Sequence, residues 1–161
     1  MSTQVLHDAA EAQETAPAPP RSRMAMASLA LIGVVIAAYM SLYKLGVIAQ
    51  VACGTGACES VQQSAWSVFL GVPVPYWGVA GYALILGLTL AGLQPRFAED
   101  RRIAAALLGA CAYAAAFSAY LTWTEAFYIQ AWCRWCVASA IVATLLFLFS
   151  LAEIPRLRGR S

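Results

Sequence analysis

Four of the five cysteines in this 161-residue chain stand in two close pairs. Cys53 and Cys58 have four residues between them, whereas Cys133 and Cys136 form a CxxC motif at the start of an apolar run. The positive end of a helix dipole and the neighbouring Arg134 both favour the thiolate form of such cysteines. A thiolate is the species that attacks disulfides and passes electrons on. The two pairs therefore predict thiol–disulfide exchange.

Two structural interpretations of the same cysteines stay open. A CxxC motif also occurs in zinc sites, and four thiolates make a complete tetrahedral ligand set. The pairs would otherwise be two inert disulfides, which oxidising compartments favour. We expect redox chemistry and no metal, because closed zinc sites of this kind are typical of soluble modules. Cys111 stands alone in an apolar run and is interpreted as a small buried hydrophobic residue.

The composition indicates that most of the chain lies in lipid. Hydrophobic residues make up 61% of the sequence, charged residues only 11%, and the mean hydropathy is +0.70. A soluble domain carries about 25% charged residues to keep its surface wet. The net charge of +2 gives no reason to expect nucleic acid as a partner.

Four apolar runs are long enough to cross a bilayer as helices, for which about 20 residues suffice. They cover residues 24–43, 75–93, 103 to 123 or 125, and 133–151. Residues 58–69 have apolar positions at near-helical spacing but are too few to cross, so they predict a short amphipathic helix at the interface. The expected fold is an all-α integral membrane protein, a four-transmembrane-helix bundle with a short interfacial capping helix.

The polar segments complete the expected organisation. Residues 1–23 are rich in Ala, Pro, Glu and Gln and are predicted to be a disordered tail. Residues 24–152 form the four-helix catalytic domain, and 153–161 form a basic tail. Eight of the ten basic residues lie in the two tails and in the turn at 94–102. The positive-inside rule places these segments in the cytoplasm, which puts both cysteine pairs at the opposite, non-cytoplasmic membrane face.

Several sequence features together resemble the bacterial homologues of vitamin K epoxide reductase. They are Cys53 and Cys58 in the first external loop, Ser64 six residues after Cys58, the sequence FLGVP at 69–73, and a CxxC motif that opens the last span. The resemblance covers residues 24–152. In the disulfide bond formation protein B family, which is also four-helical and quinone-linked, the CxxC motif lies in the first loop. Its position in the last span favours the epoxide reductase family.

This resemblance implies a role for each matching residue. Cys53 and Cys58 would exchange with a reduced thioredoxin-fold partner, and Cys58 would relay electrons to Cys133. Cys136 would face the quinone as the thiolate. Ser64 would lie on the capping helix and help hold the loop or the quinone by hydrogen bonding. The co-substrate would be a quinone, either menaquinone or ubiquinone.

The quinone ring needs a flat, apolar slot near Cys136. Trp77, at the start of the second span and level with the capping helix, is the best aromatic candidate for its wall. Other candidates are Tyr82, Phe117, Tyr120 and Trp123, although aromatic residues near helix ends commonly anchor a protein at the membrane interface. Glu125 near the external end of the third span is expected at the water boundary, with a proton relay as the alternative.

Two features of the sequence depart from the family pattern. Many bacterial members carry a fused thioredoxin-like domain after the fourth span, whereas this sequence stops at Ser161, so we expect a separate partner protein. The vertebrate enzymes have a tyrosine four residues after the last CxxC cysteine, where this chain has Ala140. The absence of this tyrosine favours quinone reduction over epoxide reduction.

The expected function is that of a multi-pass membrane thiol–disulfide oxidoreductase, which oxidises the dithiol of a thioredoxin-fold partner, reduces a quinone and so supports disulfide bond formation. The alternative is a cysteine-ligated metal-binding or structural membrane protein. A small transporter or channel subunit would require ionisable residues within its spans. Glu125 is the only real candidate for such a residue, and it lies near an end.

Overall fold

A computed structural model describes residues 21–54 and 57–157. Within these residues, four helices are long and apolar enough to cross a membrane, so the protein is a multi-pass membrane protein. The spans are Arg21–Lys44, Val74–Leu93, Arg101–Ile129 and Arg134–Glu153. The expected N-terminal tail lies outside the described residues up to residue 20, as do the last four residues of the C-terminal tail.

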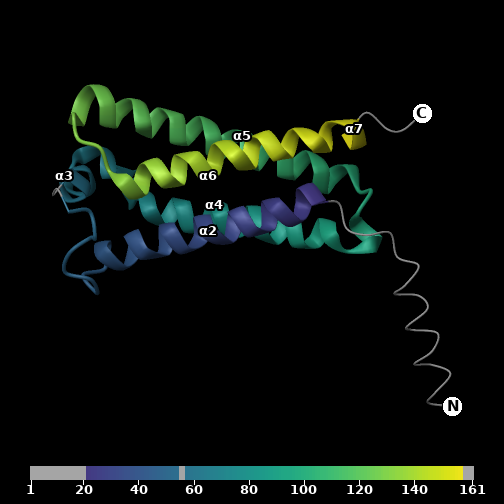
Figure 1. Cartoon of the computed structure of the whole chain (residues 1–161), viewed down its shortest axis with the longest axis horizontal. Helices are drawn as coiled ribbons and strands as arrows, with labels where there is room; N and C mark the ends of the chain where they lie inside the picture. The colour runs from purple at the N-terminus through teal and green to yellow at the C-terminus, as the bar shows by residue number, and fades with distance from the viewer. Residues whose placement is uncertain (1–20, 55–56, 158–161) are drawn as a thin grey trace, which may run out of the picture.

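The four spans lie side by side in one elongated bundle (Figure 1). Helix α2 (Arg21–Lys44) packs against α4 (Val74–Leu93) and α6 (Arg134–Ser150). Helix α5 (Arg101–Thr124) also packs against α4 and α6, which closes the bundle. The predicted all-α membrane bundle is confirmed. A helix is the expected form for each span, because it satisfies every backbone polar group without help from water.

The ends of the helices follow local chemistry. Pro73 precedes α4 and Pro75 lies in its first turn, where the missing N–H has no partner to lose. The side chain of Asp100 caps α5 by accepting a hydrogen bond from the Arg102 N–H at 2.8 Å. After Thr124 the third span continues as a π-helical turn, η3 (Glu125–Ile129).

The bundle core consists of apolar side chains from all four spans. Tyr82 donates a hydrogen bond to the Ser139 carbonyl oxygen at 2.8 Å, which joins α4 to α6 through the core. Cys111 is fully buried there, as expected for a small hydrophobic residue. The buried members of the cluster are Met26, Ala30, Ile36, Ala37, Tyr82, Ile85, Leu107, Cys111, Val142 and Leu146.

The segment that caps one end of the bundle differs from the single helix expected over residues 58–69. Helix α3 (Ala57–Gln63) ends because Ser64 has an extended backbone, with φ −67° and ψ 157°. A 3₁₀ turn, η1 (Ala65–Ser67), follows. The strands β1 (Val68–Phe69) and β2 (Val72–Pro73) then pair antiparallel.

The two strands are joined by a tight turn. Leu70 and Gly71 both have positive φ values, 53° and 78°. Two successive residues of this kind are typical of the two-residue turns that match the twist of a hairpin. The expected helix therefore covers only the first half of its range, and a small hairpin replaces the second half.

The other end of the bundle holds the start of α2 and the short elements η2 (Pro95–Phe97), η4 (Leu151–Glu153) and α7 (Ile154–Leu157). Figure 1 shows α7 and the start of α2 at this end and α3 at the opposite end. The bundle therefore separates its basic segments from the segment that carries the first cysteine pair.

A buried ion pair joins three spans at the basic end. The guanidinium group of Arg23 donates to both carboxylate oxygens of Glu153, at 3.0 and 2.6 Å, and also to the Gly92 carbonyl oxygen. Both charged side chains are almost completely buried. Arg23 was assigned to the disordered tail, and this assignment is wrong, because α2 begins at Arg21 and its first turn is packed into the bundle.

Removal of one partner of this ion pair should strongly destabilise the bundle. We expect Glu153→Ala to cost about 3–5 kcal/mol, because it leaves the Arg23 charge buried without compensation. The measurement is the Tm of the purified protein in detergent micelles. An Arg23→Met, Glu153→Leu double variant should recover most of the loss, since apolar residues can replace a buried pair. A single variant with an unchanged Tm would contradict this role.

Candidate thiol–disulfide site

The first cysteine pair is bridged. Cys53 and Cys58 form a disulfide with 6.0 Å between their Cα atoms, and both residues are buried. Gly54 between them has φ +76°, a conformation that glycine adopts without strain. Gly56, the other glycine between the two cysteines, lies outside the described residues. The disulfide therefore joins the loop after α2 to the first turn of α3.

The second pair opens the last span as two free thiols. Cys133 is the N-cap residue of α6, and its Sγ atom accepts a hydrogen bond from the Cys136 backbone N–H at 3.3 Å. The Cys136 thiol also donates to it, and this lowers the pKa of Cys133 despite the opposing effect of burial. Cys133 therefore holds negative charge more readily than an ordinary thiol, mainly because of the Cys136 thiol, whereas the sequence pointed to the helix dipole and Arg134.

The loop before the disulfide is docked onto the CxxC motif. The indole N–H of Trp135, inside that motif, donates to the Ala52 carbonyl oxygen at 3.3 Å. The hydroxyl of Tyr39 on α2 accepts a hydrogen bond from the Ala52 N–H at 3.0 Å. The rings of Tyr39 and Trp135 lie 4.9 Å apart between centroids. These contacts hold the residue next to Cys53 against the turn that carries Cys133.

All four cysteines consequently belong to one cluster of packed side chains. Cys53, Cys58 and Cys133 are buried in it, together with Met40, Val51 and Val61, and Cys136 packs against its edge. The sequence predicted that the two pairs meet at one end of the bundle. They do so in the structure, at the end opposite the Arg23–Glu153 ion pair.

Two polar side chains lie against the second pair. The carboxylate of Glu125 accepts the Cys133 backbone N–H at 3.2 Å, and only 3% of this residue is exposed. Gln62 of α3 is also buried, and its amide nitrogen lies 4.0 Å from the Cys136 Sγ atom. The expectation that Glu125 lies at the water boundary is wrong, because the π-helical turn directs it into the bundle beside the thiols.

Ser64 lies close to the site but not on the helix where it was expected. It follows the last residue of α3, and its hydroxyl donates to the Val61 carbonyl oxygen at 2.7 Å. It lines a small cavity of about 30 Å³ that also borders Gln62, Glu125 and Cys136. Its hydrogen bond therefore holds the end of the capping helix, and the roles expected for Ser64 toward the loop or the quinone stay predictions.

Cys136 faces a narrow cavity inside the bundle. This cavity has a volume of about 70 Å³. The functional groups that line it include the amide of Gln62, the carboxyl group of Glu125 and the thiol of Cys136. Its remaining lining residues are Ile36, Ala37, Met40, Val74, Pro75, Ser118, Leu121, Thr122, Trp135 and Ser139. All four spans and the capping helix therefore border one small space with the inner cysteine.

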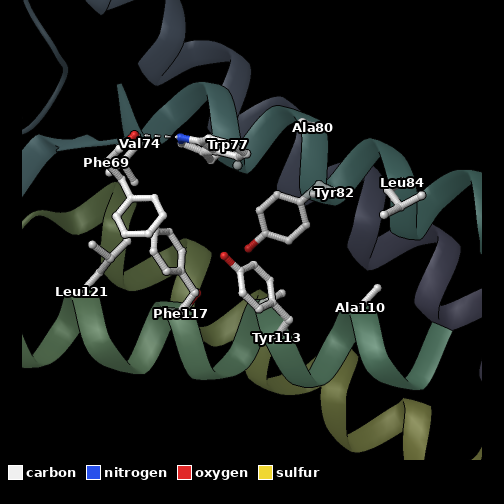
Figure 2. A pocket seen from close by; sticks show the side chains of 14 residues that line it. Phe69, Val74, Trp77, Ala80, Tyr82, Leu84, Ala110, Tyr113, Phe117 and Leu121 are labelled. Carbon is white, nitrogen blue, oxygen red and sulfur yellow. Dashed lines mark hydrogen bonds between the residues drawn. The ribbon is translucent and has the colours of Figure 1, made fainter. Parts of the chain in front are cut away.

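A larger, almost wholly apolar cavity of about 310 Å³ lies between α4 and α5 (Figure 2). It shares Val74, Ser118 and Leu121 with the narrow cavity, so the two are neighbours. Of the aromatic candidates from the sequence, Trp77, Tyr82 and Phe117 line the larger cavity. Figure 2 shows Trp77 at its upper wall, where the indole N–H donates to the Phe69 carbonyl oxygen at 3.1 Å. None of the three lines the narrow cavity at Cys136.

Lys44 fastens the capping segment to the bundle. This residue ends α2, and its ammonium group donates to the Gln62 carbonyl oxygen and, at 3.0 Å, to the Ser67 hydroxyl. It therefore supports the backbone of the residue whose side chain reaches Cys136. Sequence reasoning did not assign a role to Lys44, Gln62 or Tyr39. The one available signal was that Lys44 stands apart from the clustered basic residues.

The cysteine geometry disfavours a four-thiolate metal site. Cys53 and Cys58 are bonded to each other, which removes two of the four ligands. Among the residues that the structure describes, no group of three or more His, Cys, Asp or Glu side chains is arranged to hold a metal ion. The disulfide beside two free thiols fits exchange chemistry instead.

The membrane bundle and its adjoining disulfide and dithiol define a multi-pass membrane oxidoreductase. A model of the vitamin K epoxide reductase family matches residues 24–151, which is most of the chain. The chain therefore belongs to the vitamin K epoxide reductase family, as the spacing of its cysteines indicated.

Loss of the Lys44 contacts should loosen the capping helix. We expect Lys44→Met to speed hydrogen–deuterium exchange of residues 57–63 about ten-fold, since hydrogen bonds from a charged group contribute about 1.5–3 kcal/mol. Lys44→Arg, which keeps the charge and the donors, should stay close to the unmodified protein. Equal exchange in the Met and Arg variants would show that Lys44 does not hold the cap.

Proposed function

We propose that this protein oxidises the dithiol of a thioredoxin-fold partner and passes the electrons to a membrane quinone. In the first step a partner thiolate attacks the Cys53–Cys58 disulfide, and the partner leaves oxidised. Cys58 then attacks the oxidised Cys133–Cys136 pair at Cys133, which forms a Cys58–Cys133 disulfide and releases Cys136. Cys53 attacks Cys58 in this bond, so the Cys53–Cys58 disulfide forms again and Cys133 is freed as a thiol. Cys136, the inner cysteine, is left facing the quinone. Two electrons move from the dithiol to the quinone, which becomes the quinol, and the Cys133–Cys136 disulfide forms again.

One observation carries this proposal: the disulfide and the CxxC thiols lie in a single buried cluster. Exchange between two pairs requires that one sulfur reaches the other without unfolding of the bundle. The contacts of Trp135 and Tyr39 with Ala52 provide that proximity. If both pairs were inert structural disulfides, Cys133 and Cys136 would be bonded to each other, but both are free thiols in this structure.

The larger cavity supports a route for the quinone from the lipid. Its walls are apolar and aromatic, as a quinone site requires. It adjoins the narrow cavity that reaches Cys136. We place the quinone ring at the Cys136 end and its apolar tail between α4 and α5, past Trp77. On the side of the capping segment, Ser64 lines the small cavity that borders Cys136.

The partner approaches from the non-cytoplasmic side in this proposal. Both cysteine pairs lie at the end opposite the basic segments, and the positive-inside rule assigns the basic end to the cytoplasm. Both termini then lie in the cytoplasm. Cys53 itself is buried, but its neighbours Ala52 and Gly54 are exposed and offer a place where a partner can reach the disulfide.

The test of the reaction is a quinone-reduction assay with a reduced thioredoxin-fold protein as donor. Cys136→Ala should lower turnover to background, because no inner thiol remains to pass electrons to the quinone. The same variant should still exchange its Cys53–Cys58 disulfide with the donor. Cys111→Ala is the matched control, since it removes a buried thiol from the distant core and should leave turnover unchanged. Normal turnover by Cys136→Ala would reject the proposed electron path.

The orientation can be tested with single cysteines in a variant whose five native cysteines are replaced. Val47→Cys lies in the loop near the disulfide and Glu99→Cys in the turn at the basic end, and both positions are exposed. In intact cells a membrane-impermeant maleimide should label position 47 and not position 99. Labelling of position 99 alone would reverse the proposed orientation.

A further inference from the structure

The cavities around Cys136 contain a carboxyl group that the electron path does not use. Glu125 is buried at the external end of the third span, where a charged side chain is costly unless it has partners. One carboxylate oxygen accepts the Cys133 N–H at 3.2 Å. The carboxyl group also lies within interaction range of the Cys136 thiol. It therefore contacts both members of the reacting pair.

A second observation points to the same place. Gln62 is 4% exposed, and its side-chain oxygen has no hydrogen-bond partner in the described part of the chain. Its nitrogen lies toward Cys136, and both Gln62 and Glu125 border the narrow cavity. A buried hydrogen-bond acceptor without a partner is unfavourable unless a donor enters the site during the reaction cycle. A protonated carboxyl group or the hydroxyl of a quinol is such a donor.

We propose that Glu125 is the catalytic proton carrier between the CxxC thiols and the quinone, with Gln62 as a positioning residue. This inference rests on the proposed quinone reduction. It adds the route that the protons take, because a thiol pair loses two protons and a quinone gains two on reduction.

The proton transfers balance as follows. The Glu125 carboxylate accepts the proton of the Cys136 thiol and gives it to one quinone oxygen. It then accepts the proton of Cys133 and gives it to the other oxygen. Two electrons leave the sulfurs, the Cys133–Cys136 bond forms, and the quinone becomes the quinol. Glu125 ends as the carboxylate with which it began.

The surroundings of Glu125 leave few other candidates. Of the side chains that line the two cavities at Cys136, only Glu125 and Cys136 itself are titratable. Cys133 lies next to the carboxylate at the start of α6. The Lys44 ammonium group is directed to the Gln62 carbonyl oxygen and the Ser67 hydroxyl. These are the groups that any pH dependence of the site must include.

The test separates proton transfer from structural support by means of Glu125→Gln. The amide oxygen can still accept the Cys133 N–H, but the side chain can no longer carry a proton. The protein is first reduced, and the single-turnover oxidation of its CxxC pair by a short-chain quinone is followed between pH 5 and 9. We expect a rate about 100-fold lower, in line with the loss of general acid–base catalysis, and loss of the carboxyl-dependent part of the pH profile.

Exchange between a dithiol and the Cys53–Cys58 disulfide serves as the internal control. Glu125→Gln should leave this half-reaction within two-fold of the unmodified protein. Glu59→Gln, the same change on the capping helix, should alter neither half-reaction. Glu125→Asp keeps a carboxyl group on a shorter chain and should recover at least ten-fold of the rate lost in the Gln variant, which also covers the case that the Gln variant fails to fold.

The outcomes distinguish the two proposals. If the unmodified protein exchanges with dithiols but is not oxidised by quinone, the proposed function fails and the proton route fails with it. If the unmodified protein reduces quinone and Glu125→Gln does so at the same rate and with the same pH profile, only the proton route is rejected. An Asp variant no faster than the Gln variant also rejects it.

Discussion

Every backbone polar group inside a bilayer must find its partner within the protein, and this constraint shapes the whole molecule. Helical spans satisfy it by themselves, so irregular segments are confined to the two ends of the bundle. At one end the chain has the basic turn between α4 and α5 and the short elements that follow α6. At the other end it gathers a loop, a short helix, a hairpin and a π-helical turn. These irregular segments carry the chemistry, since they can bring distant parts of the chain together.

A few polar contacts fix the positions of the irregular segments at the end that carries the cysteines. Trp135 and Tyr39 hold Ala52, Lys44 holds the end of the capping helix, and Glu125 holds the Cys133 N–H. Each contact joins two different segments, and the contact between Trp135 and Ala52 joins residues 83 positions apart. In an environment with little competing water, such contacts are stronger than they would be at a wet surface. The position of the disulfide beside the dithiol is therefore a consequence of side chains outside both cysteine pairs.

Much of the fold was predictable from the sequence because lipid imposes a simple pattern. The four spans follow from length and apolarity, and the prolines at 73 and 75 mark where α4 starts. The capping segment was harder to predict, since Ser64 breaks the expected helix and a hairpin follows. Arg23 was misplaced because its partner, Glu153, lies 130 residues away, and a buried ion pair leaves no local signal.

In the candidate site, too, some features were predictable from the sequence and others depend on packing. Spacing singled out the four cysteines, and the four-span topology predicted that they meet at one end. It did not reveal that Gln62 faces Cys136 or that Lys44 supports it, because these contacts depend on how the capping segment is packed. Glu125 was visible as an acid near the end of a span, but its burial depends on the π-helical turn. That turn rotates the chain in a way that no simple periodicity indicates.

The most direct test of the account is whether Cys58 and Cys133 can form a bond within the folded protein. In a variant that lacks Cys53, Cys111 and Cys136, these two thiols remain, and mild oxidation followed by non-reducing peptide mass spectrometry detects their disulfide. We expect nearly complete linkage of Cys58 to Cys133, and no linkage when Cys111 is retained in place of Cys133. Two free thiols after oxidation would contradict the proposed transfer of electrons between the pairs.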